Sequence, residues 1–364
     1  MRTECLPHLN GDYMDKVMIA MSGGVDSAVT AHLIKKAGYS AMGATAIMFD
    51  RSDARFASEE CSDFDDAKRV AALVGIEHHV FDLSKEFEDT VINNFISSYL
   101  CGSTPNPCIV CNKKIKFGSL LDKAEELGCS HIASGHYAII EKDVSGRYLL
   151  KKGKDTKKDQ AYVLWQLSQH QLSRTLLPLG SFSKDEVREI AAEMNFVNSR
   201  KKESQDICFI PDGDYVEFLR RFKGLDFEIG DYIDSEGNIL GKHQGAVKYT
   251  TGQRKGLGIA LGEPIYVLGK DMINNTVTLG REEKLFDRSL DAKNINFIAF
   301  EKLSSPIKVE AKIRYSHATA KANLTQTGED SFHLEFDEPQ RAITKGQSVV
   351  LYDGEYVLGG GIIT

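Results

Sequence analysis

The clearest chemical signal near the amino terminus is the run SGGVDS at residues 22–27, between an apolar run at 16–21 and a helix-like segment at 26–37. Its two glycines lack a Cβ atom, so the backbone can curl and aim its N–H groups inward. The hydroxyls of Ser22 and Ser27 add donors, and the start of the helix adds a partial positive charge. This strand–turn–helix arrangement predicts a site for a phosphate or pyrophosphate group.

The spacing of this run excludes two common nucleotide motifs and leaves one simpler explanation. It fits neither GxxxxGK[ST] nor GxGxxG, so a kinase-like loop and a dinucleotide fingerprint are both excluded. Asp26 and Ser27 could instead serve only to cap the following helix. A helix cap does not explain the adjacent glycine pair, and we therefore favour the phosphate site.

Thiols form the second chemical signal. Cys111 follows a loop stiffened by Pro105 and Pro107 and precedes a basic stretch, Lys113 to Lys116. We expect Cys111 at a helix N-terminus beside lysines, and both features favour thiolate over thiol. Cys208 stands alone among polar residues at 203–210. The chain has seven cysteines, an odd count that argues against a structural disulfide framework.

The elements that would position these groups alternate along the first half of the chain. Short apolar runs predict strands, and amphipathic runs predict helices. The expected strands are 16–21, 43–49, 78–81 and 131–134, and the expected helices are 26–37, 65–74, 86–99 and 115–127. Such alternation predicts a Rossmann-like α/β domain with a parallel sheet covered by helices on both faces.

Beyond about residue 226 the pattern changes to short alternating runs separated by glycine-containing turns. The runs at 307–314, 332–336, 348–352 and 356–359 predict antiparallel strands. We expect an N-terminal domain at 1–218 with a loose arm at 1–15, a small β-rich central domain at 219–284, and a C-terminal antiparallel β-barrel at 285–364.

Composition indicates a globular protein of 364 residues, with 42% hydrophobic and 27% charged residues. No apolar run approaches the roughly 18 residues that cross a bilayer, and the first fifteen residues lack the apolar stretch of a signal peptide. We therefore expect a cytoplasmic protein that does not associate with a membrane. The net charge of −7 speaks against a nucleic-acid partner, but basic residues cluster at 113–116, 151–158 and 200–202.

The SGGVDS run resembles the signature of the PP-loop ATP pyrophosphatases, which split ATP into AMP and pyrophosphate while adenylating a substrate. Adenylation converts a poor leaving group, a carbonyl oxygen, into a good one. Further segments resemble the tRNA-specific 2-thiouridylase family over nearly the whole chain. These segments lie at 104–112, 134–137, 158–162, 203–210, 249–258 and 313–315.

The resemblance implies specific binding residues. ATP, with Mg²⁺, would be held by Ala20, Met21, Ser22, Gly23, Gly24, Val25, Asp26 and Ser27, with backbone contacts near Ala46 and Gly135. The target base and the anticodon region of tRNA would be contacted by Asn106, Pro107, Cys108, Lys158, Asp159, Gln160, Arg314, Tyr315 and Gln347, with His136 a further candidate. The central domain would also bind tRNA. Because the basic clusters flank the cysteines in sequence, we favour tRNA contact over a merely solvated face for them.

The resemblance also implies a reaction. ATP would adenylate the 2-carbonyl oxygen of the wobble uridine, and a persulfide on Cys208 would supply sulfur, with Cys111 as its catalytic partner. The products would be 2-thiouridine, AMP and pyrophosphate, and a Cys111–Cys208 disulfide would remain to be reduced. An upstream persulfide or sulfide donor, such as a cysteine desulfurase, would load Cys208.

One residue departs from the family pattern, because many members carry Asp where this chain has Cys108. Cys108, Cys111 and Cys208 could therefore converge and hold a 4Fe–4S cluster that takes up sulfide in place of a persulfide relay. Alternatively, Cys108 is a spectator or a resolving thiol for Cys111. Zinc is less favoured, because its fourth ligand would have to be the distant Cys101 or a histidine.

Two other functions remain open from the sequence. An amidotransferase-type synthetase would use the same loop to add ammonia to an adenylated substrate, but it leaves the cysteine segments unexplained. A tRNA-binding protein without catalysis would use the β-barrel as its binding module and would release no pyrophosphate.

Overall fold

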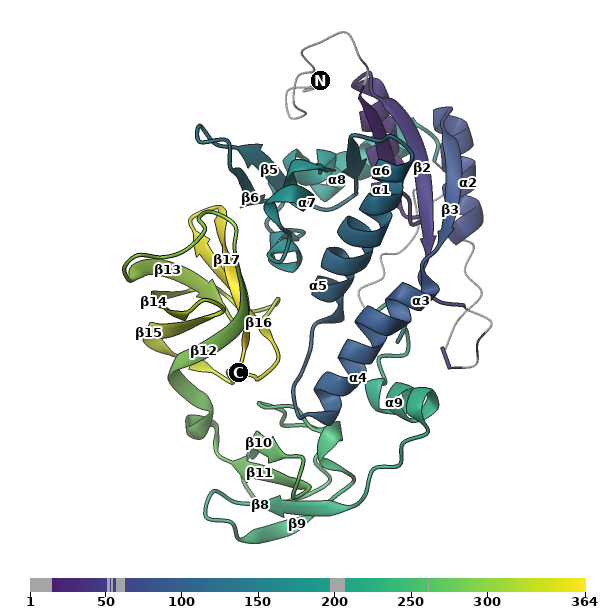
Figure 1. Ribbon diagram of the computed structural model, residues 1–364. Coiled ribbons are helices and arrows are strands. Elements are labelled where there is room, and N and C mark those ends of the chain that lie inside the picture. Colours follow the sequence, from purple (N-terminus) through teal and green to yellow (C-terminus); the bar gives the residue numbers. More distant parts are fainter. Residues whose placement is uncertain (1–14, 51–52, 54, 57–62, 197–206, 261) are drawn as a thin grey trace. The chain divides into compact units, whose positions relative to one another are not determined.

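The computed structural model describes residues 15–50, 53, 55–56, 63–196, 207–260 and 262–364 (Figure 1). The chain divides into two compact units. The first comprises Met1–Val91, Cys108–Pro211 and Glu355–Leu358, and the second comprises Ile92–Pro107, Asp212–Gly354 and Gly359–Thr364. Within the described ranges, no helix combines the length and apolar character that a membrane crossing needs.

A parallel sheet forms the centre of the first unit, in the order β3-β2-β1-β4-β7. Every neighbouring pair in it is parallel, which confirms the α/β prediction. The strands are β1 (Lys16–Ala20), β2 (Ser40–Ile47), β3 (Glu77–Asp82), β4 (His131–Ala133) and β7 (Thr175–Leu176). The chain moves outward from β1 through β2 to β3 and then returns to the other side of β1 as β4. The order therefore reverses between β1 and β4, where α/β sheets open a crevice at their carboxyl edge.

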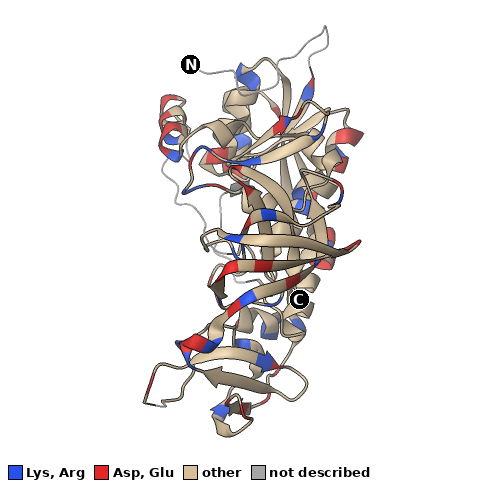
Figure 2. Ribbon diagram, turned by 90° about the vertical axis from the view of Figure 1, so that its left-hand side faces the viewer, with Lys and Arg blue, Asp and Glu red and all other residues tan. Residues whose placement is uncertain are grey.

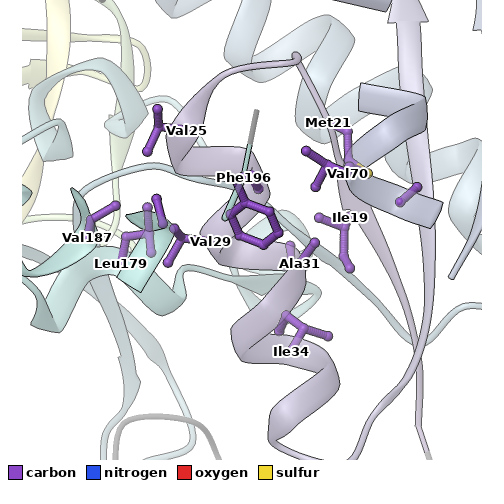
Figure 3. Close-up of a cluster of buried hydrophobic side chains, with 14 of the residues drawn as sticks. Ile19, Met21, Val25, Val29, Ala31, Ile34, Val70, Leu179, Val187 and Phe196 are labelled. Atoms are coloured by element: carbon purple, nitrogen blue, oxygen red, sulfur yellow. The ribbon is translucent and has the colours of Figure 1, made fainter. Parts of the chain in front are cut away.

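Helix α1 (Val25–Lys36) packs against two other helices, α2 (Asp63–Val74) and α8 (Lys184–Glu193). Its side chains Val29, Ala31 and Ile34 are fully buried, and Figure 3 shows Val29 on the side of Val187 of α8 and Ala31 on the side of Ile19 of β1. Because α1 is enclosed in this way, its first turn is fixed relative to the end of β1.

The first unit also contains short helices, 3-10 turns and a β-hairpin. They are α3 (Ser84–Phe87), α5 (Pro107–Cys111), α6 (Leu120–Glu126), α7 (Gln169–Ser173), the 3-10 turns η3 (Ala161–Leu164) and η4 (Pro178–Ser181), and the hairpin β5 (Ala138–Lys142) with β6 (Tyr148–Lys152). Two π-helical stretches are present, η1 (Glu88–Ile92) and η2 (Asn112–Ser119). The hairpin was not predicted.

The cysteine segment differs from the sequence prediction. Residues after Pro107 were expected to remain a loop until 115, but the helix begins at Pro107 and runs through η2 and α6 to Glu126. Proline suits the first position of a helix, because its ring fixes φ and its missing N–H would be unpaired there anyway. Cys108 therefore lies in the first turn, and Cys111 lies one turn further in rather than at the N-terminus.

The second unit contains two β structures. A small sheet has the order β10-β11-β8-β9, made of β8 (Gly230–Ile233), β9 (Ile239–His243), β10 (Tyr266–Asp271) and β11 (Thr276–Gly280). The helical elements are α4 (Asn93–Leu100), α9 (Tyr215–Lys223), η5 (Ala246–Lys248) and η6 (Glu282–Leu285). This sheet confirms the expected β-rich central region.

The predicted C-terminal barrel is also confirmed. Six strands follow the order β12-β15-β14-β13-β16-β17, and pairing of β12 with β17 closes the barrel. They are β12 (Phe286–Phe297), β13 (Ile307–Lys312), β14 (Ala320–Gly328), β15 (Ser331–Arg341), β16 (Ser348–Asp353) and β17 (Tyr356–Ile363). Gly361 of β17 is required inside the barrel, since an added Cβ would lie 3.0 Å from the ring of Phe332.

Candidate nucleotide and thiol site

The loop at 22–27 follows β1 and leads directly into α1. Gly23 has φ +73°, a left-handed conformation that side chains rarely adopt, so the turn requires glycine. Gly24 occupies the N-cap position of α1 with φ −86° and ψ 164°. No side chain caps the helix there, which argues against the simpler explanation of the loop as a capped helix start.

Ser27 stabilises the loop through two hydrogen bonds of its buried hydroxyl. Its hydroxyl donates to the Gly24 carbonyl at 2.9 Å and accepts from the Ser22 N–H at 3.3 Å. The side chain is 5% exposed, whereas Ser22 is exposed. Ser27 therefore holds the curl of the backbone, and Ser22 offers its hydroxyl toward solvent.

Strand β2 ties the start of the loop to the sheet edge. The Met21 N–H donates to the Ala44 carbonyl at 2.8 Å, and the Thr45 hydroxyl donates to the Met21 carbonyl at 2.8 Å. Ala46 follows in the same strand, paired with Phe81 of β3. The residues expected to hold ATP thus lie at the end of β1, in the loop and helix start that follow it, and in the adjacent parallel strand β2.

Gly135 approaches the first turn of α1 from β4. A Cβ added to Gly135 would lie 2.9 Å from the Asp26 Cβ, so glycine allows the two backbones to approach closely. The Asp26 carboxylate accepts hydrogen bonds from the Tyr137 hydroxyl at 2.8 Å and from the Lys184 ammonium at 2.7 and 2.9 Å. Gly135 was predicted to contact ATP and lies here beside the phosphate loop, whereas Tyr137 and Lys184 were not assigned roles.

The cysteine helix carries the second half of the site. Cys108 is exposed, Cys111 is buried, and the Cys111 Sγ lies 4.0 Å from the Met48 Sδ. Met48 follows β2 directly, three residues beyond Thr45, which anchors the phosphate loop. Cys111 therefore lies beside the same sheet edge as the loop.

Cys208 is held by the hydrophobic residues that follow it. Phe209 and Ile210 are each 1% exposed, and the Phe209 ring packs edge-on against Phe87 at 5.7 Å. The Ile210 N–H donates to the Ile207 carbonyl at 2.8 Å, which closes a turn with the exposed Cys208 inside it. The neighbouring residues 197–206, which include Arg200, Lys201 and Lys202, lie outside the described residues.

The three thiols influence each other electrostatically. Burial raises the pKa of Cys208, and the charges of Cys111 and Cys108 raise it further. Burial also raises the pKa of Cys108. Although Cys108 and Cys208 touch solvent, the protein around them is dense enough to disfavour their thiolate forms. The three cysteines thus lie near enough for the charge of one to affect another, and their convergence on one reacting group stays a prediction.

The predicted activation of Cys111 is wrong for the structure as it stands. Burial raises the pKa of Cys111 to about 11, and the nearby Lys116 lowers it by less than burial raises it. Cys111 is 7% exposed and lies within a helix instead of at its N-terminus, so the expected helix-end stabilisation is absent. Near neutral pH the site holds thiols.

Lys116 is the cation shared by all three cysteines, since it lowers the pKa of each. It lies in the π-helical stretch η2, in which residues five apart lie near each other on the helix surface. In an α-helix, a residue five positions after Cys111 would lie roughly 140° away from it. The wider π-turn therefore brings Lys116 toward the cysteine face, which the sequence pattern did not reveal.

His136 connects the two halves of the site. It is 8% exposed, its Nδ1 lies 2.8 Å from the Ser134 hydroxyl, and its ring packs 5.7 Å from Phe117 of η2. Burial, together with Lys116, lowers its pKa well below the usual value, so the imidazole is neutral. Gly135 thus faces the phosphate loop while the next residue faces the helix that carries Cys111.

The described residues contain no group of three His, Cys, Asp or Glu side chains placed to hold a metal ion. The predicted cluster ligands Cys108, Cys111 and Cys208 are close enough to interact electrostatically but do not form such a group as they stand.

The side chains of Asp159 and Gln160 form hydrogen bonds within the fold. The Asp159 carboxylate accepts the Gly153 N–H at 2.9 Å and the Ala161 N–H at 3.2 Å. The Gln160 side chain accepts the Tyr137 N–H at 3.0 Å. Gln160 thereby supports the segment that contains His136, and Lys158 lies partly exposed in the adjoining turn.

The second unit contains the remaining predicted tRNA contacts. Arg314 donates to the Arg341 carbonyl at 2.9 Å, and Tyr315 is 44% exposed with the Lys312 ammonium 5.4 Å from its ring centre. Gln347 donates to the Thr104 carbonyl at 2.8 Å, two residues before the partly exposed Asn106. Tyr315 is therefore available to stack on a base.

The basic run at 151–158 is partly neutralised. Lys151 lies 3.4 Å from Glu141, and Lys154 makes two 2.8 Å bonds to Glu186. Figure 2 shows positive and negative residues interspersed along the strands and helices. Of the lysines in this run, Lys157 is exposed and forms no ion pair with another described residue, so it is the better candidate for a phosphate contact.

Comparisons with known proteins cover almost the whole chain. Family models match residues 15–212 as a tRNA methyl transferase HUP domain, 217–281 as a tRNA methyl transferase PRC-barrel domain, and 287–363 as an aminomethyltransferase beta-barrel domain. A tRNA-specific 2-thiouridylase of Clostridioides difficile is 51% identical over 96% of this chain and 98% of its own length. The corresponding proteins of Halothermothrix orenii and Clostridium kluyveri are 50% and 48% identical, each over 96% of this chain and 99% of their own lengths.

Proposed function

The chain belongs to the tRNA-specific 2-thiouridylase family, and we propose that it replaces the 2-oxygen of the wobble uridine in tRNA with sulfur, using ATP. The observation that carries this proposal is the shared sheet edge. Gly135 lies against the phosphate loop, and the adjacent His136 packs on the helix of Cys111. A phosphate site and a set of thiols on one edge suit adenylation followed by sulfur transfer.

In the first step, the loop at 20–27 binds ATP with Mg²⁺, with Ala46 and Gly135 beside the nucleotide. The uridine 2-oxygen attacks the α-phosphorus, and pyrophosphate leaves. The uridine is then linked through that oxygen to AMP. Backbone N–H groups at the start of α1 and the curled glycines stabilise the phosphate charge.

In the second step, a Cys208 persulfide, loaded by a separate persulfide donor, supplies its outer sulfur to C2 of the uridine. The C–O bond breaks and AMP leaves with the original oxygen. The Cys111 thiolate attacks the inner sulfur of Cys208, which releases 2-thiouridine and forms a Cys111–Cys208 disulfide. A thiol reductant then restores both cysteines, which requires a reducing compartment such as the cytoplasm.

Because the pKa of Cys111 is about 11, a base must remove its proton during the reaction. The neutral imidazole of His136 is the candidate base, and the positive charge of Lys116 stabilises the thiolate that forms. The flipped base contacts Asn106, Pro107 and Cys108. Other parts of the tRNA contact Lys158, Asp159, Gln160, Arg314, Tyr315 and Gln347.

A 4Fe–4S cluster held by Cys108, Cys111 and Cys208 is the alternative to the persulfide relay for sulfur transfer. Among the described residues, these thiols do not form a group placed to hold a metal. Anaerobic purification with iron and sulfide measurement tests it. A content of about four iron atoms per chain would favour the cluster over the persulfide relay. Iron-free protein that still thiolates tRNA would support the relay.

The division into a catalytic domain at 1–218, a central tRNA-binding domain at 219–284 and a barrel at 285–364 is part of the same proposal. Limited proteolysis tests it, because exposed linkers are cleaved first. Fragments that end near 218 and 284 are expected, and cleavage only inside these ranges would contradict the division.

Mass spectrometry of tRNA nucleosides tests the function directly. Wild-type protein incubated with ATP, unmodified tRNA and a persulfide donor should produce 2-thiouridine and one pyrophosphate for each. The family descriptions speak of methyl transfer, so the same spectra are examined for methylated uridine. Methylated nucleoside, or pyrophosphate release without tRNA, would contradict the proposal.

A further inference from the structure

A glutamine from α7 bonds to the π-helical stretch that follows Cys111. The Gln171 Nε2 donates to the Lys113 carbonyl at 2.8 Å and to the Phe117 carbonyl at 2.6 Å, and both carbonyls belong to η2. These two bonds use both N–H groups of the side-chain amide. Gln171 lies 58 and 54 residues from these two positions in the chain, so the contact is made by the fold and not by neighbours in the sequence.

The oxygen of the same amide fixes the direction in which the amide faces. The Gln171 Oε1 accepts the Ser168 N–H at 3.0 Å, and the Ser168 hydroxyl accepts the Gln171 N–H at 3.2 Å, which together form the capping box that begins α7. Turning the amide over would place its oxygen against two carbonyl oxygens. Gln171 is therefore held with its two donors toward η2.

A π-helical stretch needs donors of this kind. A π-turn joins residues five apart and an α-turn joins residues four apart, so one carbonyl group lacks its regular N–H partner where the two patterns meet. The chain also leaves space for the Lys113 carbonyl, since a Cβ added to Gly118 would lie 2.9 Å from its oxygen. Gly118 and Gln171 therefore both favour the π-helical position of this carbonyl.

The form of this stretch matters for the thiol site because it contains Lys116, five residues after Cys111. The charge of Lys116 acts on all three cysteines and on His136. The carbonyls that Gln171 binds belong to residues before and after Lys116, so these bonds fix the turn from which its side chain projects. In an α-helical form of the same stretch, Lys116 would turn away from the face that carries Cys111.

We propose that Gln171 is a positioning residue for sulfur transfer: by holding η2 in its π-helical form, it keeps Lys116 on the side of the cysteines. The inference rests on the proposed function and deepens it. Gln171 acts through Lys116 and not on a reacting atom. Its loss should leave α7 in place, because Glu125 of α6 contacts His170 at 3.3 Å and Arg174 at 3.8 Å.

Two substitutions remove the donors in different ways. Gln171→Glu keeps the capping box, in which glutamate is favoured, but sets a carboxylate oxygen against the two carbonyls. Gln171→Met removes the amide and adds no charge. Both should speed hydrogen exchange of the amides at 112–120, measured by mass spectrometry, because the stretch opens more often. Both should also lower the kcat of tRNA thiolation roughly 3- to 10-fold, while the KM values for ATP and tRNA stay within about twofold of wild type.

The same helix offers matched controls. Gln169→Glu makes the same chemical change two residues away, where the amide bonds to the backbone of Tyr148 in β6 and not to η2. Ser168→Ala removes the capping hydroxyl and leaves the donors of Gln171 in place. Both controls should keep the wild-type kcat and the wild-type hydrogen exchange at 112–120.

A double variant separates positioning of Lys116 from a general structural loss. If Gln171 acts through Lys116, Gln171→Met/Lys116→Met should have the same kcat as Lys116→Met alone. A general loss of folded structure would instead multiply with the effect of Lys116→Met.

Two results would overturn the inference. One is a wild-type kcat in both Gln171 variants, and the other is a double variant whose loss equals the product of the two single losses. If Gln171→Met does not fold, Gln171→Glu decides the question alone and in combination with Lys116→Met, since it keeps the capping box. Wild-type protein that forms no 2-thiouridine would overturn the proposed function itself, whereas unchanged hydrogen exchange in the Gln171 variants would show separately that Gln171 does not hold η2.

Discussion

The phosphate loop and the thiol site lie at one sheet edge but are prepared for chemistry in opposite ways. The loop is already organised: Gly23 is in its required conformation, Ser27 braces the curl, and Asp26 is paired. The thiol site is protonated, because burial raises the pKa of its cysteines, and the histidine beside it is neutral. Nucleotide binding therefore needs little rearrangement, whereas sulfur transfer requires a deprotonation that comes only with the reaction.

Replacing Cys111 or Cys208 should lower the thiolation rate and should be the most damaging of these changes. Cys111→Ser and Cys208→Ser should each lower the thiolation rate by roughly 1,000-fold or more, because each removes a reacting sulfur. Binding of tRNA and of ATP should remain, since the loop does not depend on either side chain. Cys129→Ser is the control, because this buried cysteine lies 3.4 Å from Met42 and outside the site. Thiolation that persists in either variant removes that residue from the mechanism.

The loop itself is tested by a pair of adjacent glycines. Gly23→Ala forces a side chain to φ +73°, at a cost of roughly 1–2 kcal/mol, and should weaken ATP binding about 5- to 30-fold. Gly24 has φ −86°, and an added Cβ would meet only the Ser22 Oγ at 3.5 Å, so Gly24→Ala should bind ATP nearly as wild type does. Thiol alkylation rates should be unchanged in both variants. Equal loss of ATP affinity at both positions would show that steric access, rather than backbone conformation, matters.

The loop could be recognised from the sequence because its chemistry is contiguous. Residues 22–27 carry the glycines, the hydroxyls and the helix start together, and their spacing alone excludes other nucleotide motifs. The parallel sheet and the barrel were predictable for the same reason, since their periodicity is local. The partner of Asp26 was not predictable, because Lys184 lies 158 residues away and only the packing of α8 on α1 brings it there.

The thiol site was predicted less well. Its three cysteines were identified, but the charge state of Cys111 depends on burial, which no spacing reveals. The helix begins at Pro107 and continues past Cys111 into a π-helical stretch, so Cys111 does not lie at the helix N-terminus. The sequence thus indicated the candidate reactive residues but not the environment in which the fold places them.

Lys116 provides an intermediate test within the thiol site. Because its charge lowers the pKa of all three cysteines, Lys116→Met should slow their alkylation by iodoacetamide at pH 8 roughly 3- to 10-fold. Lys114→Met is the matched control, since Lys114 lies in the same π-helical stretch but is exposed. ATP affinity should not change in either variant. Unchanged alkylation in Lys116→Met would remove Lys116 as the shared cation.

The smallest expected effect is on stability at alkaline pH. The pKa of Cys111 is about 11 in the folded protein, and an unfolded thiol has a pKa of about 8.5. The folded state therefore holds this proton more tightly, so its contribution to stability is present below pH 8.5 and is lost as pH rises toward 11. Thermal unfolding between pH 8 and 10.5 should show a steeper fall for wild type than for Cys111→Ser. Parallel curves would contradict the buried-thiol account.

The most direct measurement follows the oxygen that leaves the uridine. Unmodified tRNA carrying ¹⁸O at the 2-carbonyl of the wobble uridine is incubated with ATP and a persulfide donor, and the AMP is analysed by mass spectrometry. If the loop and the thiols act on the same base, each 2-thiouridine formed is matched by one ¹⁸O in AMP. Label that appears in water or stays in the nucleoside, with unlabelled AMP, would contradict the account.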